Sequence, residues 1–452
     1  MKPFGRRVEE AAAPIAAAPQ KVAATPAPAP GLAPDAVLLF RLRGKIMERL
    51  DSGVIAEMSP DVLRAQLEPV IHEIAGQEHV LLSARDQGQL AQQLTDEMVG
   101  FGPLEPLLRD DSIGDIMVNG PDTVFVEVRG KLRKADVRFR DAEHVAMVAQ
   151  KMVATIGRRV DESSPLCDAR LPDGSRVNVI FPPLALDGPC ISIRKSSQKK
   201  LDFAGMVANG SMNPSVARVL EIAARCRLNI LVSGGTGSGK TTLLNALSQM
   251  ISHDERILTI EDAAELQLQQ PHVVRLETRT ANLEGRGEIN QRELLRNALR
   301  MRPDRIIVGE VRGAEAYDML QAMNTGHDGS ISTVHANTTR DAISRVENMV
   351  LMATANLPTR AIRTQIVSAV DLIIQIERMR DGVRRVSQVS DLCGMEGEVI
   401  SLNDVASFAF EGEDAAGGIF GRYHSAVARP SFAHRLGYYG LENAWMDALQ
   451  EL

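Results

Sequence analysis

The segment that most constrains the fold is residues 228–243, LNILVSGGTGSGKTTL. An apolar run is followed by a glycine-rich turn and then by leucines at helical spacing. Gly234, Gly239, Lys240 and Thr241 fill every fixed position of the pattern G-x-x-x-x-G-K-[ST]. A flexible Gly/Ser linker is the alternative, but the strand-like run before the turn and the leucines after it argue against that. The pattern predicts a buried strand, a phosphate-binding loop and a helix.

The residue types of this loop fit a nucleoside triphosphate with its metal ion. Glycines allow backbone angles that direct successive N–H groups at one anion, at the positive end of the following helix. Lys240 can reach the β- and γ-phosphates, and the Thr241 hydroxyl can ligate Mg²⁺. A dinucleotide loop is excluded because the glycine spacing is G-x-G-x-G and not G-x-G-x-x-G. The sequence thus predicts ATP and Mg²⁺ bound by Gly234, Gly235, Thr236, Gly237, Ser238, Gly239, Lys240, Thr241 and Thr242.

Composition limits the class of protein. A chain of 452 residues, 44% hydrophobic and 24% charged, is typical of two to four soluble globular domains. The net charge of −7 argues against a broad nucleic-acid-binding face. No apolar run of about 18 residues occurs, so we expect no membrane span. The cysteines Cys167, Cys190, Cys226 and Cys393 lack metal-ligand spacing and are expected to be buried thiols in a reducing cytoplasm.

Five regions follow one another along the chain. Residues 1–36, of which nineteen are Ala or Pro, predict a disordered tether. Residues 37–100 predict a helical bundle, and 101–200 predict a smaller α+β domain. Residues 205–400 alternate strands and helices, which predicts a parallel sheet covered by helices. Residues 401–452 form a C-terminal tail with eight of the sixteen aromatic residues, either a docking tail or a cluster folded onto its own domain.

After the phosphate loop, two apolar runs each end in an acidic residue. Residues 305–312, RIIVGEVR, place Glu310 at a strand end, where it can hold the metal ion or a water bound to that ion. Residues 257–265, ILTIEDAAE, place Glu261 where a carboxylate can act as general base for an attacking water. The alternative for the second run is that Asp262 and Glu265 cap a helix and compensate its dipole.

The remaining candidates are a histidine and three arginines. His335 follows a third strand, in GHDGSISTVHAN, and suits a hydrogen bond to the γ-phosphate better than metal ligation; a satisfied core histidine is the alternative. Arg170, Arg176 and Arg194 in the smaller domain are either solvated side chains or cations that reach a nucleotide at a domain or subunit boundary.

In the order of these motifs along the chain, the sequence resembles the type II/IV secretion ATPase superfamily. It resembles most of all the CpaF-like branch, which drives tight-adherence (Tad) pili. The resemblance covers about residues 100–400. It is carried by the segments 171–178, 188–195, 234–241, 255–266, 300–313, 326–337 and 368–386.

The resemblance implies an α/β fold with a RecA-like P-loop domain, a smaller α+β N-terminal domain and an N-terminal helical bundle. It implies ATP hydrolysis, with catalytic roles for Glu261 and Glu310, γ-phosphate sensing by His335, Mg²⁺ at Thr241 and Glu310, and nucleotide contacts from Arg170, Arg176 and Arg194. It also implies a homo-hexamer in the cytoplasm that is peripherally associated with the inner membrane, through the 37–100 bundle or a face of the ring, and passes its motion to a pilus platform protein. No nucleic acid is expected. A nucleic-acid-translocating P-loop ATPase, a P-loop kinase and a nucleotide-binding scaffold without turnover are the alternatives.

Overall fold

The computed structural model describes residues 45–46, 58–128, 130–196, 201–279, 286–354, 356–415, 417–427 and 429–452. The predicted tether 1–36 and most of residues 37–57 therefore lie outside the described residues. The chain divides into two compact units, Met1–Gly102 and Pro103–Leu452.

In the first unit two helices pack together, α3 (Pro60–Gln77) and α4 (Ala84–Met98). A capping box starts α4: the Ser83 side chain accepts from the backbone N–H of Asp86, and the Asp86 carboxylate accepts from the Ser83 N–H. Apolar residues at helical spacing form the shared core of the pair. Its buried members are Ile46, Leu63, Leu67, Ile71, Ile74, Leu90, Ala91 and Leu94.

The second unit begins with a six-stranded antiparallel sheet in the order β3-β2-β1-β6-β5-β4. The short helices η1 (Gly102–Leu104) and α5 (Glu105–Arg109) precede it, and α6 (Ala142–Ala154) lies between β3 and β4 in the chain. The strands are β1 (Ile113–Asn119), β2 (Val124–Val128), β3 (Lys131–Lys134), β4 (Leu166–Arg170), β5 (Arg176–Ile180) and β6 (Cys190–Arg194).

A nine-stranded sheet follows, in the order β15-β14-β13-β12-β7-β11-β10-β8-β9. The six strands from β12 to β9 are parallel, and β13, β14 and β15 add an antiparallel extension. The strands are β7 (Ile230–Ser233), β8 (Ile257–Glu261), β9 (Val273–Glu277), β10 (Arg305–Val311), β11 (Ile331–Val334), β12 (Leu372–Arg378), β13 (Arg384–Glu396), β14 (Val399–Glu413) and β15 (Ile419–His424).

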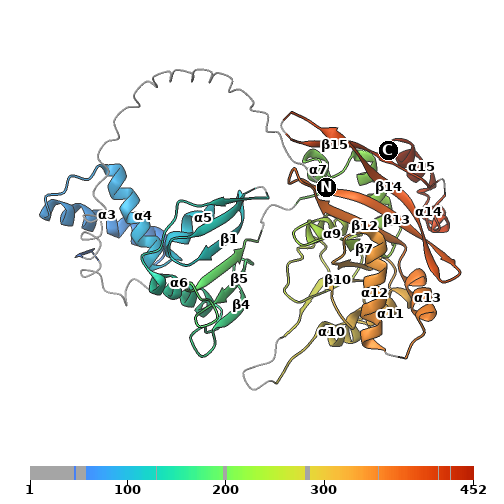
Figure 1. The fold of residues 1–452 in the computed structure, drawn as a ribbon, viewed down its shortest axis with the longest axis horizontal. Coiled ribbons are helices and arrows are strands. Elements are labelled where there is room, and N and C mark those ends of the chain that lie inside the picture. Colours follow the sequence, from blue (N-terminus) through green and yellow to red (C-terminus); the bar gives the residue numbers. More distant parts are fainter. Residues whose placement is uncertain are drawn as a thin grey trace, which may run out of the picture. The chain divides into compact units, whose positions relative to one another are not determined.

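Helices cover both faces of this sheet, as the strand composition requires. Alternate residues of β7 enter different cores: Ile230 and Val232 join one cluster and Leu231 joins the other. The first face holds α7 (Phe203–Ala208), α8 (Pro214–Arg225), α9 (Lys240–Ser248), α14 (Ala433–Tyr438) and α15 (Glu442–Gln450). The second holds α10 (Gln291–Ala298), α11 (Glu315–Asn324), α12 (Thr339–Ala353) and α13 (Thr359–Ala369) (Figure 1). The predicted fold class, a RecA-like α/β domain with a smaller α+β domain before it, is confirmed.

The residues after 400 contribute directly to the nine-stranded sheet and its core. Trp445 is fully buried and meets Phe432 edge-to-face, with 5.2 Å between ring centroids. Arg435 donates to the Arg227 carbonyl and forms ion pairs with Asp328 and Asp371. Of the two alternatives for the aromatic tail, these contacts correspond to a cluster folded onto its own domain.

The expectation that all four cysteines are buried is wrong. Cys167 and Cys226 are buried, but Cys190 is half-buried and Cys393 is exposed. Cys393 lies where the pairing of β13 with β14 shifts register, between Leu392 and Gly394, and its thiol lies 3.6 Å from the Asp391 carboxylate.

Candidate nucleotide-binding and catalytic site

The phosphate loop connects β7 to α9, and its glycines are needed for two different reasons. Gly237 and Gly239 have positive φ angles of 68° and 100°, a region that L side chains rarely adopt. Gly234 is required by close packing: a Cβ there would lie 2.4 Å from both the Ile376 carbonyl oxygen and the Ser238 hydroxyl oxygen. These glycines therefore allow a tight turn that leads into α9, the arrangement in which a phosphate loop directs its N–H groups at an anion.

Lys240 lies in this turn as the first residue of α9. Its ammonium donates to the carbonyl oxygens of Gly234 and Gly235, at 2.9 and 3.0 Å. An ammonium has three donors, so one remains for a phosphate oxygen. Burial lowers the pKa of Lys240, the Glu310 carboxylate opposes that shift, and the cations Arg312 and Arg194 add to it. These charged groups thus surround the loop.

Glu261 ends β8 and is 3% exposed. One carboxylate oxygen accepts the backbone N–H groups of Glu265 and Leu266, at 2.7 and 2.9 Å. The other is buried and has no hydrogen-bond partner within the described part of the chain. Burial raises the pKa of Glu261 to about 7, against the opposing effect of the two N–H donors. A carboxyl group that titrates near neutrality suits a general base.

The alternative that Asp262 and Glu265 cap a helix is wrong. The chain after Glu261 forms an irregular loop and no helix starts there. Instead Glu261 itself binds the loop's N–H groups, while Asp262 and Glu265 form ion pairs with Arg312 and Arg176, at 3.5 and 3.0 Å.

Glu310 lies near the end of β10, with its side chain about one-quarter exposed. Arg312 donates to one of its carboxylate oxygens from two nitrogens, at 2.6 and 3.1 Å. That hydrogen bond raises the pKa of Arg312. The residue before Glu310 must be glycine, because a Cβ on Gly309 would lie 2.9 Å from the Cγ of Glu261. The G-E dipeptide thus lets two carboxylates sit on neighbouring strands.

His335 directly follows β11, the strand between β7 and β10. Its imidazole is half-buried and makes no hydrogen bond to any other residue that the structure describes. Because β7, β8, β10 and β11 are parallel, their carboxyl ends share one edge of the sheet. The loop, Glu261, Glu310 and His335 are therefore brought together there, at the edge where open α/β sheets bind ligands.

The three arginines of the smaller sheet form one cross-strand row. Arg170 of β4 pairs in register with Arg176 of β5, which pairs with Arg194 of β6. Each has a carboxylate partner: Arg170 with Glu277 at 3.6 Å, Arg176 with Glu265 at 3.0 Å and Arg194 with Asp115 at 3.2 Å. Sequence spacing did not reveal this row, because it depends on strand register.

Sequence reasoning also missed two other arginines at this site, Arg312 and Arg384. The position of Arg312, two residues after Glu310, was a signal that could have identified it. Arg384 begins β13 and donates to the Gly237 carbonyl at 2.8 Å, across 147 residues of sequence that carry no local signal.

The oxygen donors present fit Mg²⁺ as a companion of bound phosphates. Thr241 offers a hydroxyl in the first turn of α9, and Glu310 and Glu261 offer carboxylate oxygens, one of them unpaired. Across the described residues there is no group of three or more His, Cys, Asp and Glu that could hold a metal ion. Mg²⁺ usually binds proteins through one or two carboxylates, keeps several waters and takes its other ligands from substrate phosphates. When bound, Mg²⁺ would neutralise phosphate charge.

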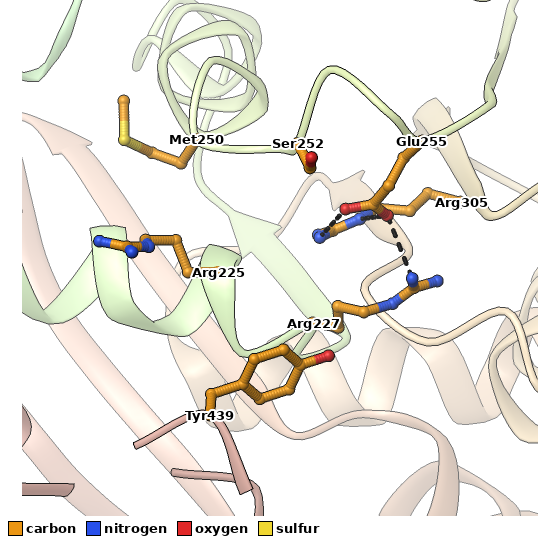
Figure 2. A pocket seen from close by; sticks show the side chains of 7 residues that line it. All are labelled: Arg225, Arg227, Met250, Ser252, Glu255, Arg305 and Tyr439. Carbon is orange, nitrogen blue, oxygen red and sulfur yellow. Dashed lines mark hydrogen bonds and ion pairs between the residues drawn. The ribbon is translucent and has the colours of Figure 1, made fainter. Parts of the chain in front are cut away.

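A separate cavity of about 490 Å³ lies at the opposite edge of the sheet (Figure 2). Its lining is Arg225, Arg227, Met250, Ser252, Glu255, Arg305 and Tyr439. Arg305 holds Glu255 through two bonds of 2.6 and 2.8 Å, and Arg227 lies 3.4 Å from the same carboxylate. Arg305 and Arg227 also donate to backbone carbonyls. The guanidinium groups of Arg305 and Arg227 are thus already bonded within the protein. We therefore assign nucleotide binding and catalysis to the edge of the sheet that carries the phosphate loop.

The family profile described as "Type II/IV secretion system protein" matches residues 97–398, about two-thirds of the chain. The chain belongs to this family. The match covers the six-stranded sheet and the strands of the nine-stranded sheet from β7 to β13, and it ends before β14. Family membership and the complete phosphate loop together make the chain an ATPase that uses a nucleotide substrate.

Individual relatives agree with this assignment. The chain is 43% identical to Rv3659c of Mycobacterium tuberculosis, a protein named for conjugal transfer, over 68% of this chain and 88% of that protein. It is 34% identical to the conjugal transfer protein TrbB of Rhizobium radiobacter, over 64% and 86%. A solved VirB11 ATPase from the Brucella suis type IV secretion system is 31% identical, over 64% and 91%, with a TM-score of 0.35.

Proposed function

We propose that this secretion-family ATPase is a motor. It hydrolyses ATP at the carboxyl edge of the nine-stranded sheet and converts turnover into movement of a pilus or secretion apparatus. The observation that supports this most is the meeting of Lys240, Glu261, Glu310 and His335 at one edge. Water attacks the γ-phosphorus of ATP, the bond from that phosphorus to the β–γ bridging oxygen breaks, and ADP leaves together with inorganic phosphate. One of the two glutamates orients the water and accepts its proton, and His335 senses the γ-phosphate.

The arginines are the proposed link from chemistry to movement. Arg170 and Arg176 belong to the smaller sheet, yet their carboxylate partners Glu277 and Glu265 belong to the larger one. A triphosphate competes for the same guanidinium groups. On ATP binding these arginines would then exchange their carboxylate partners for phosphate oxygens, and after hydrolysis they would return to the carboxylates. That exchange would shift the smaller sheet against the larger one.

For the branch of the family, the oligomeric state and the location, we rely on the resemblance seen in the sequence. We propose a CpaF-like homo-hexamer that drives Tad pili, works in the cytoplasm at the inner membrane and contacts a platform protein there. The five-part domain organisation predicted from the sequence belongs to the same proposal. Where the structure describes the chain, no helix is both long and apolar enough to cross a bilayer.

Steady-state ATP turnover across a range of protein concentrations tests the motor proposal, with Lys240→Ala as the inactive reference. A ring with shared active sites predicts specific activity that rises steeply as subunits assemble. Full activity in a dilute monomer would overturn the ring.

A nucleic-acid-translocating ATPase is the second candidate, favoured by relatives named for conjugal transfer. Against it, the arginines at the site are paired with carboxylates and the chain's net charge is −7. Single-stranded DNA added to the same assay separates the two. Stimulation that falls steeply with salt would favour the second candidate, and unchanged turnover would favour the first.

A further inference from the structure

Arg384 is the one guanidinium among the described residues that donates a hydrogen bond to the phosphate loop itself. It lies at the start of β13, just after the β12–β13 turn, in which Gly382 has a φ of 87°. Its Nε donates to the Gly237 carbonyl at 2.8 Å. Its Cδ lies 3.2 Å from the position a Cβ would take on Gly239. The side chain is thus packed along the outer side of the loop.

The contact matters because of how a phosphate loop works. When successive N–H groups turn inward to an anion, some carbonyl groups of the same peptides turn outward and need their own partners. The Gly237 carbonyl is such a group, and its partner is a cation, so the bond is charge-assisted. A bond of this type favours the backbone conformation in which the N–H groups are available for phosphate.

A second contact ties Arg384 to the smaller sheet. The Glu127 carboxylate, on β2, lies 3.7 Å from Arg384 and 3.4 Å from Arg378. The Glu127 side chain is 17% exposed and the Arg384 side chain 43% exposed, so solvent screens this pairing in part. Arg384 is therefore shared between a carbonyl of the phosphate loop and a carboxylate of the smaller domain.

We propose that Arg384 is a positioning residue for the nucleotide site. It holds the Gly237 carbonyl outward, which keeps the loop's N–H groups directed at the phosphates, and Glu127 orients it for this task. The inference rests on the proposed nucleotide site and adds a contact through which the smaller domain influences phosphate affinity. Arg384 acts through the loop and need not touch the nucleotide.

The test measures binding of a fluorescent ATP analogue, the KM and kcat for ATP, and the Tm without nucleotide, for Arg384→Ala and Arg384→Lys. A hydrogen bond from a charged donor predicts that Arg384→Ala weakens nucleotide affinity by about tenfold or more. The loss appears in Kd and KM, with kcat and Tm nearly unchanged. Arg384→Lys recovers part of the affinity, because an ammonium can still donate to one carbonyl.

Arg380→Ala is the matched control. Arg380 lies in the same β12–β13 turn, but it pairs with Glu413 and lies over the Phe410 ring, so nucleotide affinity should stay at the wild-type value. Glu127→Gln removes the carboxylate that orients Arg384 and leaves the nine-stranded sheet unchanged. It should weaken nucleotide affinity by a smaller factor than Arg384→Ala does.

Wild-type nucleotide affinity in Arg384→Ala would overturn the inference, whatever the result for Glu127→Gln. So would a loss in Arg384→Ala that only follows a fall in Tm and is not restored by lysine. A wild-type protein that binds no nucleotide would instead overturn the proposed function on which the inference rests.

Discussion

Replacing Glu261 by glutamine should stabilise the fold in a pH-dependent way. The amide oxygen of the introduced glutamine can accept the N–H groups of Glu265 and Leu266 as the carboxylate does. Its amide nitrogen then takes the place of the carboxylate oxygen that has no partner among the described residues. The substitution therefore keeps the local hydrogen bonds and removes a buried charge, which is costly without compensation.

The size of the effect follows from the pKa of Glu261, which burial raises from 4.5 to about 7. A carboxyl group with a raised folded-state pKa stabilises the fold when protonated, and this stability is lost as the pH rises through the folded pKa. Between about pH 8 and about pH 5.5, linkage gives the wild type about 2 kcal/mol of added unfolding free energy from this group. Other groups titrate over the same range, but they do so equally in both proteins.

The assay is urea unfolding of nucleotide-free wild type and Glu261→Gln at several pH values. The variant should be the more stable protein at about pH 8, and its advantage should shrink by about 2 kcal/mol at about pH 5.5. A difference between the two proteins that stays constant across this range would refute the reasoning, because it would show that Glu261 is not a carboxyl group with a raised pKa.

Other predictions concern the same edge and the C-terminal segment. Gly309→Ala should push Glu261 aside and lower ATP turnover by about tenfold to a hundredfold while nucleotide binding persists, as measured by steady-state kinetics and by analogue binding. Trp445→Ala should lower the unfolding free energy by about 3–5 kcal/mol in urea, because the ring is fully buried. Arg435→Ala should lower the Tm, since Asp371 and Asp328 lose a common partner, and Arg435→Lys should recover only part of that loss.

Local patterns predicted the parts of the fold and site that depend on nearby residues. The phosphate loop follows from glycine spacing, and the strands that end at Glu261 and Glu310 follow from apolar runs with an acid at the end. Asp381-Gly382 indicated the turn between β12 and β13 in the same way. In each case a few neighbouring residues determine the conformation.

Features that depend on register or on distant packing were not predictable in this way. The row of Arg170, Arg176 and Arg194 exists because three strands align at one level. Arg384 reaches Gly237 only because β12 lies beside β7. Likewise the burial that raises the pKa of Glu261 comes from the surrounding fold, and the adjacent acids suggested a helix cap that does not form.

The central claim is that ATP is bound by the phosphate loop and hydrolysed by the acids beside it. The most direct measurement is binding and hydrolysis of ATP on the same preparations of wild type, Lys240→Ala and Glu310→Gln. The account predicts that wild type binds and hydrolyses, that Lys240→Ala does neither, and that Glu310→Gln binds ATP but hydrolyses it much more slowly. Hydrolysis that survives in Lys240→Ala at the wild-type rate would contradict it.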